Sequence, residues 1–349
     1  MSSTDPAALG QVRILRDAAG TRTTFDELEI GKDLGSLVWT PTQSQVDQVC
    51  ERMEDHHPYY EVESPFGGTV VPTHMTYLMI RGLFSQTYSV RGLFYKWGLE
   101  LLEPIRTGVT YRVDAKLTEK WIRNDREFVA YEGTCTDPRG AVVFRTRRAH
   151  VLDFIKRTAP KVGEGAIGTS DARTQAAREA RAQVWDAHWP ADDTAAGTGR
   201  IELAPLARPD TPVGAQLPPN SIYFSRAKFL KRQNMYFAGA NPTLHVSDEA
   251  ARQEGLPAPV ASAPDIMAMC HQCALDFFGA GWLRGGKADL TASRPTYMHE
   301  YLTASGVVTS REELPGGAVR LHCEMSVQNQ KGEKKVVGKL SGMVPAAAR

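Results

Sequence analysis

The sequence predicts an α+β protein made of two tandem copies of one unit, each an antiparallel sheet wrapped around a central helix. A duplication is indicated by three features that occur twice: an apolar helix-like segment, a proline that opens a β-like stretch, and a turn that ends in glycine. The paired positions, 189, 191 and 192 residues apart, are Thr73 and Ser262, Pro104 and Pro295, and Gly140 and Gly332. Such close agreement among three spacings favours a tandem repeat over coincidence.

The central helix is clearest in the second copy. Residues 266–278 are apolar on several sides and carry a single charge, at Asp276, so we expect protein to surround this helix. Ser262 is a good N-cap, and Asp265 stands three residues later, where a capping box has its acidic or amide partner. The matching helix of the first copy is predicted to begin at Thr73.

Strands follow each predicted helix. Apolar and polar residues alternate from Val319 to Val327, which is typical of a strand with one buried face. The matching strand of the first copy covers residues 127–136 and is closed by the turn 137–140, with proline second and glycine fourth. A buried helix followed by strands that curl around it is the hot-dog architecture. Two copies predict a double hot dog, with the two sheets joined edge to edge.

The repeats set the expected domain organisation. We expect an N-terminal hot-dog repeat over residues 1–157 and a C-terminal one over residues 201–349. The segment 158–200 is rich in alanine and glycine and reads as a linker, with one short helix predicted over residues 171–185.

Composition excludes several classes of protein. The 349 residues include 41 basic and 40 acidic ones, and a net charge of +1 argues against nucleic-acid binding. The five cysteines are odd in number and scattered, which favours a reducing compartment without disulfides. Because the chain has neither a secretory signal nor a long apolar stretch, we expect a cytoplasmic protein without a membrane partner.

Three segments resemble the MaoC-like acyl-thioester dehydratases of the hydratase-2 type. Residues 24–37 resemble the opening strand and turn of that family. Residues 241–262 resemble its signature, an Asn-Pro-aliphatic-His step followed by Gly and Pro-Val-Ala, and residues 55–73 resemble the form of that signature found in N-terminal halves. The resemblance implies a hydratase or dehydratase for an enoyl or β-hydroxyacyl thioester of coenzyme A or acyl carrier protein. It implies no metal or other cofactor, and it implies a homodimer.

The catalytic pair of that family is divided between the two halves. The family places an aspartate five residues before its histidine. Here the equivalent histidine is His245, but Ala240 stands five residues before it. The first half has the opposite pattern, because Asp55 is present and Tyr60 stands where the histidine would be. Each half therefore holds one member of the pair.

Two acid–base assignments follow from the resemblance. His245 could act alone, since histidine titrates near neutral pH, or it could simply bond to the backbone of its loop. Asp55, with His57 and Tyr60, could form an alternative set in the first half, or Asp55 could only cap a turn. Both assignments stay open from the sequence.

The resemblance also implies a thioester site at the start of each helix, where free N–H groups and the helix dipole favour a developing oxyanion. Small residues there would let the thioester approach closely. The candidate substrate-binding residues are Asn241, Ser262, Ala263, Thr73, His74 and Gly68.

The sequence is also compatible with other functions. A chain with a divided pair could be a non-catalytic thioester-binding or scaffold protein, and the same fold could support thioester hydrolysis. Cys270 and Cys273 share a helix face without a second cysteine pair, so they predict core packing rather than a metal site. The basic residues between 226 and 232 could contact coenzyme A phosphates or the acidic face of a carrier protein, or could form a solvated helix face.

Overall fold

The computed structural model describes residues 23–88, 90, 92–152, 207–230, 244–253 and 256–346, without the side chains of residues 78 and 86. The predicted boundaries near residues 157 and 200 lie outside these ranges, so they stay predictions. The helix predicted over residues 171–185 also lies outside the described residues.

A single antiparallel sheet of ten strands runs through the described part of the chain, in the order β1-β3-β4-β5-β2-β7-β10-β9-β8-β6. From either outer edge inward, each half contributes its first, third, fourth, fifth and second strand. This repeated order confirms the predicted double hot dog. The strands are β1 (Asp33–Trp39), β2 (Leu93–Leu101), β3 (Tyr111–Arg123), β4 (Arg126–Thr136), β5 (Val142–Val151), β6 (Asn220–Tyr223), β7 (Lys287–Ala292), β8 (Tyr301–Glu313), β9 (Val319–Asn329) and β10 (Lys334–Val344).

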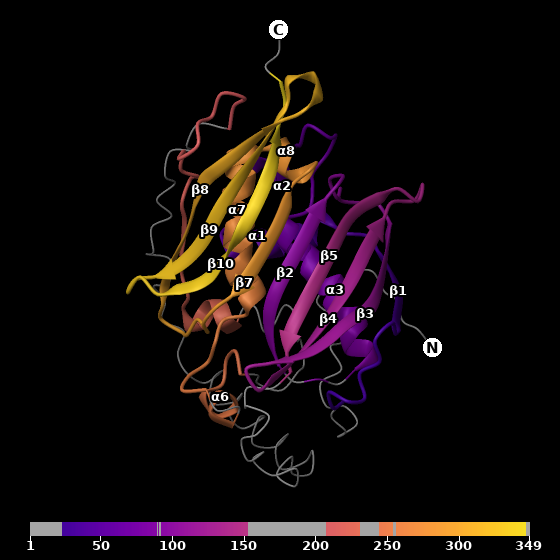
Figure 1. Ribbon diagram of the computed structural model, residues 1–349, viewed down its shortest axis with the longest axis vertical. Helices are drawn as coiled ribbons and strands as arrows, with labels where there is room; N and C mark the ends of the chain where they lie inside the picture. The colour runs from indigo at the N-terminus through magenta and orange to yellow at the C-terminus, as the bar shows by residue number, and fades with distance from the viewer. Residues whose placement is uncertain are drawn as a thin grey trace.

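The two halves join edge to edge through β2 and β7, as predicted. These strands pair antiparallel, with Trp97 opposite Leu290 and Gly98 opposite Asp289. The halves therefore lie side by side, the first in indigo to magenta and the second in orange to yellow (Figure 1). Tyr111 and Tyr301 open the equivalent strands β3 and β8, 190 residues apart, in agreement with the spacing of the sequence repeat.

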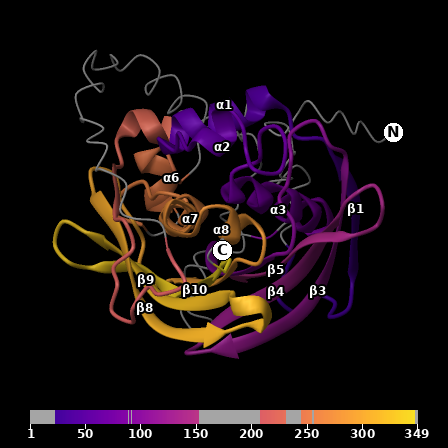
Figure 2. The ribbon, with the colours of Figure 1, turned by 90° about the horizontal axis from the view of Figure 1, so that it is seen from above.

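The helices lie on one face of this sheet. Figure 2 shows the two central helices, α3 and α7, against the concave face, with α1 and α2 on their far side. Within the described ranges, no helix is both long enough and apolar enough to span a membrane. The helices are α1 (Gln43–Met53), α2 (Pro58–Glu61), the 3₁₀ turn η2 (Thr73–Met75), α3 (Thr76–Thr87), α6 (Asp248–Gln253), α7 (Ala263–Phe278), α8 (Ala280–Leu283) and the 3₁₀ turn η4 (Pro315–Gly317).

Helix α7 is the predicted central helix of the second half, and protein surrounds it along nearly its whole length. Ser262 occupies the N-cap position as expected, but its hydroxyl makes no capping hydrogen bond. The expected capping-box role of Asp265 is therefore wrong. Its carboxylate instead accepts a hydrogen bond from Arg52 of the first half, over 2.9 Å, because a buried guanidinium is a stronger partner than a backbone amide.

The first-half helix begins at Thr73, as predicted, but as the 3₁₀ turn η2 that leads directly into α3. The indole Nε1 of Trp282, which belongs to α8, donates to Thr73 Oγ1 over 3.2 Å. The start of the first central helix is thus attached to the second half.

The predicted strands and turns also form. Side chains alternate between more and less buried along β9, and β4 covers the predicted strand over residues 127–136. Gly140 N–H donates to Asp137 and Gly332 N–H donates to Asn329, each over 2.9 Å. Both glycines have positive φ, 83° and 76°, which accounts for glycine at the ends of these turns.

Helix α1 was not predicted, although its start is marked in the sequence. Thr42 and Gln45 form a reciprocal capping box at its N-terminus. Val46, Val49 and Met53 bury one face of the helix. In Figure 2, α1 lies above the central helices, so the first half covers part of the helical layer that both halves share.

Candidate functional site

A tight corner between α1 and α2 displays Asp55, His57 and Tyr60 together. Glu54 adopts the left-handed conformation that ends α1, with φ of 54°. The chain then reverses, and Asp55 N–H donates to the Cys50 carbonyl over 3.0 Å. His57 is the N-cap of α2, and Pro58 follows at its first position. Local sequence alone therefore brings these three predicted residues to one place.

This corner packs against α7 of the other half. Gln272 Nε2 donates to the Met53 carbonyl over 3.3 Å, and the Gln272 side chain also hydrogen-bonds the Asp55 carboxyl. Asp276 lies four residues after Gln272, on the same face of α7. The structure thus brings Asp55 beside two polar residues that were not among the predicted site residues.

Burial makes the carboxyl groups of this corner weak acids. Asp55 is half-buried, and loss of solvent, followed by the negative charge of Asp276, raises its pKa to about 7. Burial also raises the pKa of Asp276 to about 6. A carboxyl with a pKa near 7 can both accept and donate a proton at neutral pH, as an acid–base catalyst does.

His57 and Tyr60 are neutral side chains at this corner. His57 Nδ1 accepts from Tyr59 N–H over 3.2 Å, and burial lowers the pKa of His57 to about 4. A neutral ring that accepts at Nδ1 carries its proton on Nε2. Tyr60 is buried, and loss of solvent, followed by the charge of Asp55, raises the pKa of its hydroxyl far above its usual value.

We expect these carboxyls to make the folded protein less stable as the pH rises. Their folded pKa values, about 7 and about 6, lie above the value of about 3.9 in an unfolded chain. Folding therefore favours the protonated forms, and this stabilisation is lost as the pH rises through the folded pKa values. The Asp55→Asn variant has no titrating carboxyl at this position. Its free energy of unfolding should therefore fall less than that of the wild type between about pH 5 and pH 8. Urea denaturation tests this, and equal losses in both proteins would contradict the assignment.

His245 is held at the start of α7. Its Nδ1 lies 2.6 Å from the Val260 carbonyl oxygen, and Val260 N–H donates to the Leu244 carbonyl over 3.1 Å. Val260 lies two residues before Ser262, the N-cap of α7. A neutral ring that donates from Nδ1 carries its lone pair on Nε2. His245 is therefore bonded to a residue that lies two positions before Ser262 and three before Ala263. Asn241 lies outside the described residues, so the grouping of these residues in one site stays a prediction.

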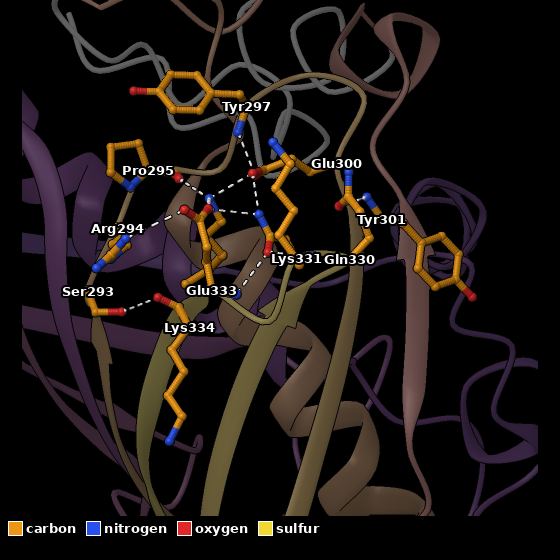
Figure 3. Close-up of polar contacts among 12 residues, drawn as sticks. Ser293, Arg294, Pro295, Tyr297, Glu300, Tyr301, Gln330, Lys331, Glu333 and Lys334 are labelled. Carbon is orange, nitrogen blue, oxygen red and sulfur yellow. Dashed lines mark hydrogen bonds and ion pairs between the residues drawn. The ribbon is translucent and has the colours of Figure 1, made fainter.

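A buried ion network supports the loop that holds His245. Lys335 Nζ lies 2.7 Å from a Glu300 carboxylate oxygen and 3.0 Å from the Pro295 carbonyl. Tyr297 N–H donates to Glu300 over 2.9 Å, and Figure 3 shows Tyr297 and Glu300 in this arrangement. Because Tyr297 forms a β-bridge with Val260, the network fixes the backbone that orients the histidine.

The two halves do not supply a single catalytic pair. His245 is attached beside the N-terminus of α7, whereas Asp55 contacts Gln272. Ten residues separate Ser262 from Gln272, which corresponds to about 15 Å along a helix. His245 and Asp55 thus belong to two separate half-sites.

His74 lies in a buried cluster between the halves. Its Nε2 is 2.8 Å from Arg52 Nη2 and 3.3 Å from Asp265 Oδ1. All three side chains are buried. The cluster joins α1, η2 and α7, so His74 and Thr73, which contacts Trp282, take part in contacts between the halves. Their predicted roles in substrate binding stay predictions.

Gly68 has a conformational reason to be glycine. It lies exposed in a turn with φ of 70°, and its carbonyl accepts from Ser64 N–H over 2.9 Å. A Cβ at this position would meet no atom within 4 Å. The left-handed backbone, rather than close packing, accounts for the residue.

The remaining candidates have structural partners. All five cysteines, Cys270 and Cys273 included, are free and buried. In the part of the chain that the structure describes, no three His, Cys, Asp or Glu side chains are grouped to hold a metal ion. From the basic run, Lys228 pairs with Glu54 over 2.6 Å and Arg226 pairs with Asp248 over 3.2 Å.

Solved structures share this architecture, although no protein-family model and no curated protein sequence matches the chain. A MaoC-like dehydratase matches 92% of this chain and 99% of its own, with a TM-score of 0.69 and 19% identity. A MaoC-like dehydratase from Phytophthora capsici matches 94% and 100%, with a TM-score of 0.59 and 14% identity. A Mycobacterium tuberculosis protein with a double hot-dog fold matches 92% and 98%, with a TM-score of 0.53 and 13% identity. The chain therefore shares the double hot-dog fold of MaoC-like dehydratases.

Proposed function

Because the chain has the fold of MaoC-like dehydratases, we propose that it hydrates an enoyl thioester, or dehydrates a β-hydroxyacyl thioester, of coenzyme A or acyl carrier protein. The observation that best supports this proposal is the corner at Asp55. There a half-buried carboxyl with a pKa of about 7 lies beside a neutral histidine, a tyrosine and a second weak-acid carboxyl. This set suits proton transfer at neutral pH.

In the proposed reaction, the Asp55 carboxylate takes a proton from water as the water oxygen bonds to the β-carbon. The electrons of the double bond move toward the thioester carbonyl and form an enolate. The carboxylic acid of Asp55 then gives its proton to the α-carbon, so that one water molecule has been added. His57 Nε2–H and the Tyr60 hydroxyl would orient the water, because both are neutral donors.

The enolate oxygen requires donors of its own, and the start of the first central helix is suited to supply them. N–H groups in the first turn of a helix point away from it, and such a donor is worth about 3–4 kcal/mol in related sites. Two contacts link the start of this helix to the segment that holds Asp55. Arg52, three residues before Asp55, contacts His74, and Val70 N–H donates to the Tyr59 carbonyl over 3.0 Å.

His245 is the alternative base, in the second half. It is bonded to Val260, two residues before Ser262, the N-cap of α7. Its ring could take the water proton through Nε2, with Asn241 orienting the thioester. The same assay distinguishes the half-sites, because each assignment names a different residue whose removal stops the reaction.

The test is ultraviolet-monitored hydration of a panel of enoyl thioesters, on coenzyme A and on acyl carrier protein. The proposal predicts loss of the enoyl absorbance with wild-type protein, strong loss of rate in Asp55→Asn, and near-normal rate in His245→Ala. A near-normal rate in Asp55→Asn with a strong loss of rate in His245→Ala would assign the reaction to the second half. Absence of hydration with every thioester would contradict the proposed function.

Two further measurements distinguish the other functions. Release of free thiol without hydration would indicate a thioesterase. Tight thioester binding in calorimetry without any turnover would indicate a binding or scaffold protein.

A further inference from the structure

The interior of the N-terminal half contains a buried basic cluster where a hot-dog core would ordinarily be apolar. Its residues come from α3, β4 and β5, and Figure 2 shows α3 against the concave face of the sheet. Its two guanidinium groups are almost fully buried, since Arg81 is 9% exposed and Arg148 is 0% exposed. The buried basic cluster consists of Arg81 and Ser85 on α3, Tyr131 on β4, and Arg148 and His150 on β5.

Arg148 has a structural role that explains its position. It donates from Nη2 to the Thr76 carbonyl over 2.8 Å and from Nη1 to the Tyr77 carbonyl, which attaches β5 to the first turn of α3. Its guanidinium carbon also lies 5.0 Å from the centre of a Trp97 ring. Burial lowers the pKa of Arg148 to about 10, so it stays charged at neutral pH.

Arg81 and Ser85 are less fully satisfied. The Arg81 side chain hydrogen-bonds the Tyr131 hydroxyl, and its guanidinium carbon lies 5.4 Å from the centre of the Phe84 ring. Arg81 Nη1 has no hydrogen-bond partner, and neither has the hydroxyl of Ser85, which is 2% exposed. The two residues are four positions apart, so they share one face of α3. A buried donor without a partner is costly, and a buried charge more so. Both groups therefore point to a ligand that accepts hydrogen bonds.

The positive charge of the cluster indicates which charge a ligand there would carry. Among the described residues, no carboxylate forms an ion pair with Arg81 or Arg148. Tyr131 and His150 bond to each other over 2.8 Å and add no charge, because burial raises the pKa of Tyr131 and lowers the pKa of His150 far below its usual value. Two positive charges thus lie in the core, where charges are ordinarily paired. An anion would therefore suit this cluster.

We propose that the buried basic cluster binds a carboxylate at the far end of the substrate's acyl chain, through Arg81 and Ser85. This inference rests on the proposed function, which puts the thioester carbonyl at Thr73 and His74. Arg81 lies seven residues beyond His74, or about 10 Å along the helix. An acyl chain that runs along α3 from the thioester would reach Arg81 at this length, and the substrate class is then an ω-carboxyacyl thioester. The phosphates of the carrier lie on the other side of the thioester from the acyl chain, so they would not reach this cluster.

The test compares two saturated coenzyme A thioesters of equal chain length, one ending in a methyl group and one in a carboxylate, by isothermal titration calorimetry. We expect wild-type protein to bind the carboxylate form about 10- to 100-fold more tightly, as a charge-assisted contact provides. Arg81→Met should abolish this preference and Ser85→Ala should reduce it. Arg145→Met is the control. It removes an exposed arginine from β5, the strand that carries Arg148, and it should leave the preference for the carboxylate unchanged.

The thermal stability of the free protein gives a second readout. An unsatisfied buried charge destabilises the fold, so Arg81→Met should raise the Tm if Arg81 is kept for a ligand. Equal binding of the two thioesters, no binding of either, or an undiminished preference in Arg81→Met would overturn the inference. Because these ligands are saturated, a preference for the carboxylate without any hydration of enoyl thioesters would support this site while contradicting the proposed function.

Discussion

Replacing Asp55 by asparagine is expected to reduce the hydration rate by about 100- to 10,000-fold, the usual worth of a positioned acid–base group. Asparagine keeps the size of the side chain and can bond to Gln272, but it cannot exchange a proton. Initial rates of enoyl absorbance loss at saturating thioester measure the effect. The folded protein should remain intact, because this change also removes a buried charge whose pKa is displaced to about 7.

Asp47→Asn is the matched control for this prediction. Asp47 lies on the exposed face of α1, where it accepts a hydrogen bond from Gln43 over 2.7 Å. The Asp47→Asn variant should hydrate the thioester at a rate within about twofold of the wild-type rate, since a substitution at an exposed position disturbs the fold little. A rate in Asp55→Asn equal to that of the control would exclude Asp55 as the acid–base group. If the hydration rate fell only in the His245→Ala variant, the second half would be the active one.

The largest expected loss of stability comes from Asp265→Ala. Asp265 and Arg52 form a buried ion pair across the two halves, with the nitrogen and oxygen 2.9 Å apart. Removing the carboxylate leaves the buried Arg52 guanidinium without this partner, which costs about 3–5 kcal/mol in comparable cases. Urea denaturation of the full chain should therefore show a marked fall in the free energy of unfolding.

An exposed ion pair provides the comparison. Asp114→Ala removes the partner of Arg112 on the sheet surface, and it should cost at most about 1 kcal/mol. The double variant Arg52→Met/Asp265→Leu should recover much of the lost stability, because an apolar pair of similar volume often replaces a buried ion pair well. A cost for Asp265→Ala no greater than that for Asp114→Ala would show that the buried pair does not hold the halves together.

The fold could be predicted because its signals are local and occur twice. The period-two alternation of β9 and the uncharged run of α7 each predict one element without reference to the rest of the chain. The spacing of the repeats then indicates that both halves have the same topology. This accounts for the correct prediction of the edge-to-edge double sheet from sequence.

The candidate site could be predicted only in part, because the polar residues that contact Asp55 come from the other half. Asp55, His57 and Tyr60 lie within six residues and meet at one corner. Gln272, which contacts the same corner, lies more than 200 residues away, and no local pattern relates it to Asp55. Asp265 shows the opposite problem, since its spacing from Ser262 matched a capping box although a distant arginine is its partner.

The central claim, that the protein adds water across an enoyl thioester, is tested most directly by running the reaction in deuterium oxide. Hydration through Asp55 should give a β-hydroxyacyl thioester that carries one deuterium on its α-carbon, with the thioester bond intact in the mass spectrum. An unchanged enoyl thioester, or a free acid with a released thiol, would contradict it.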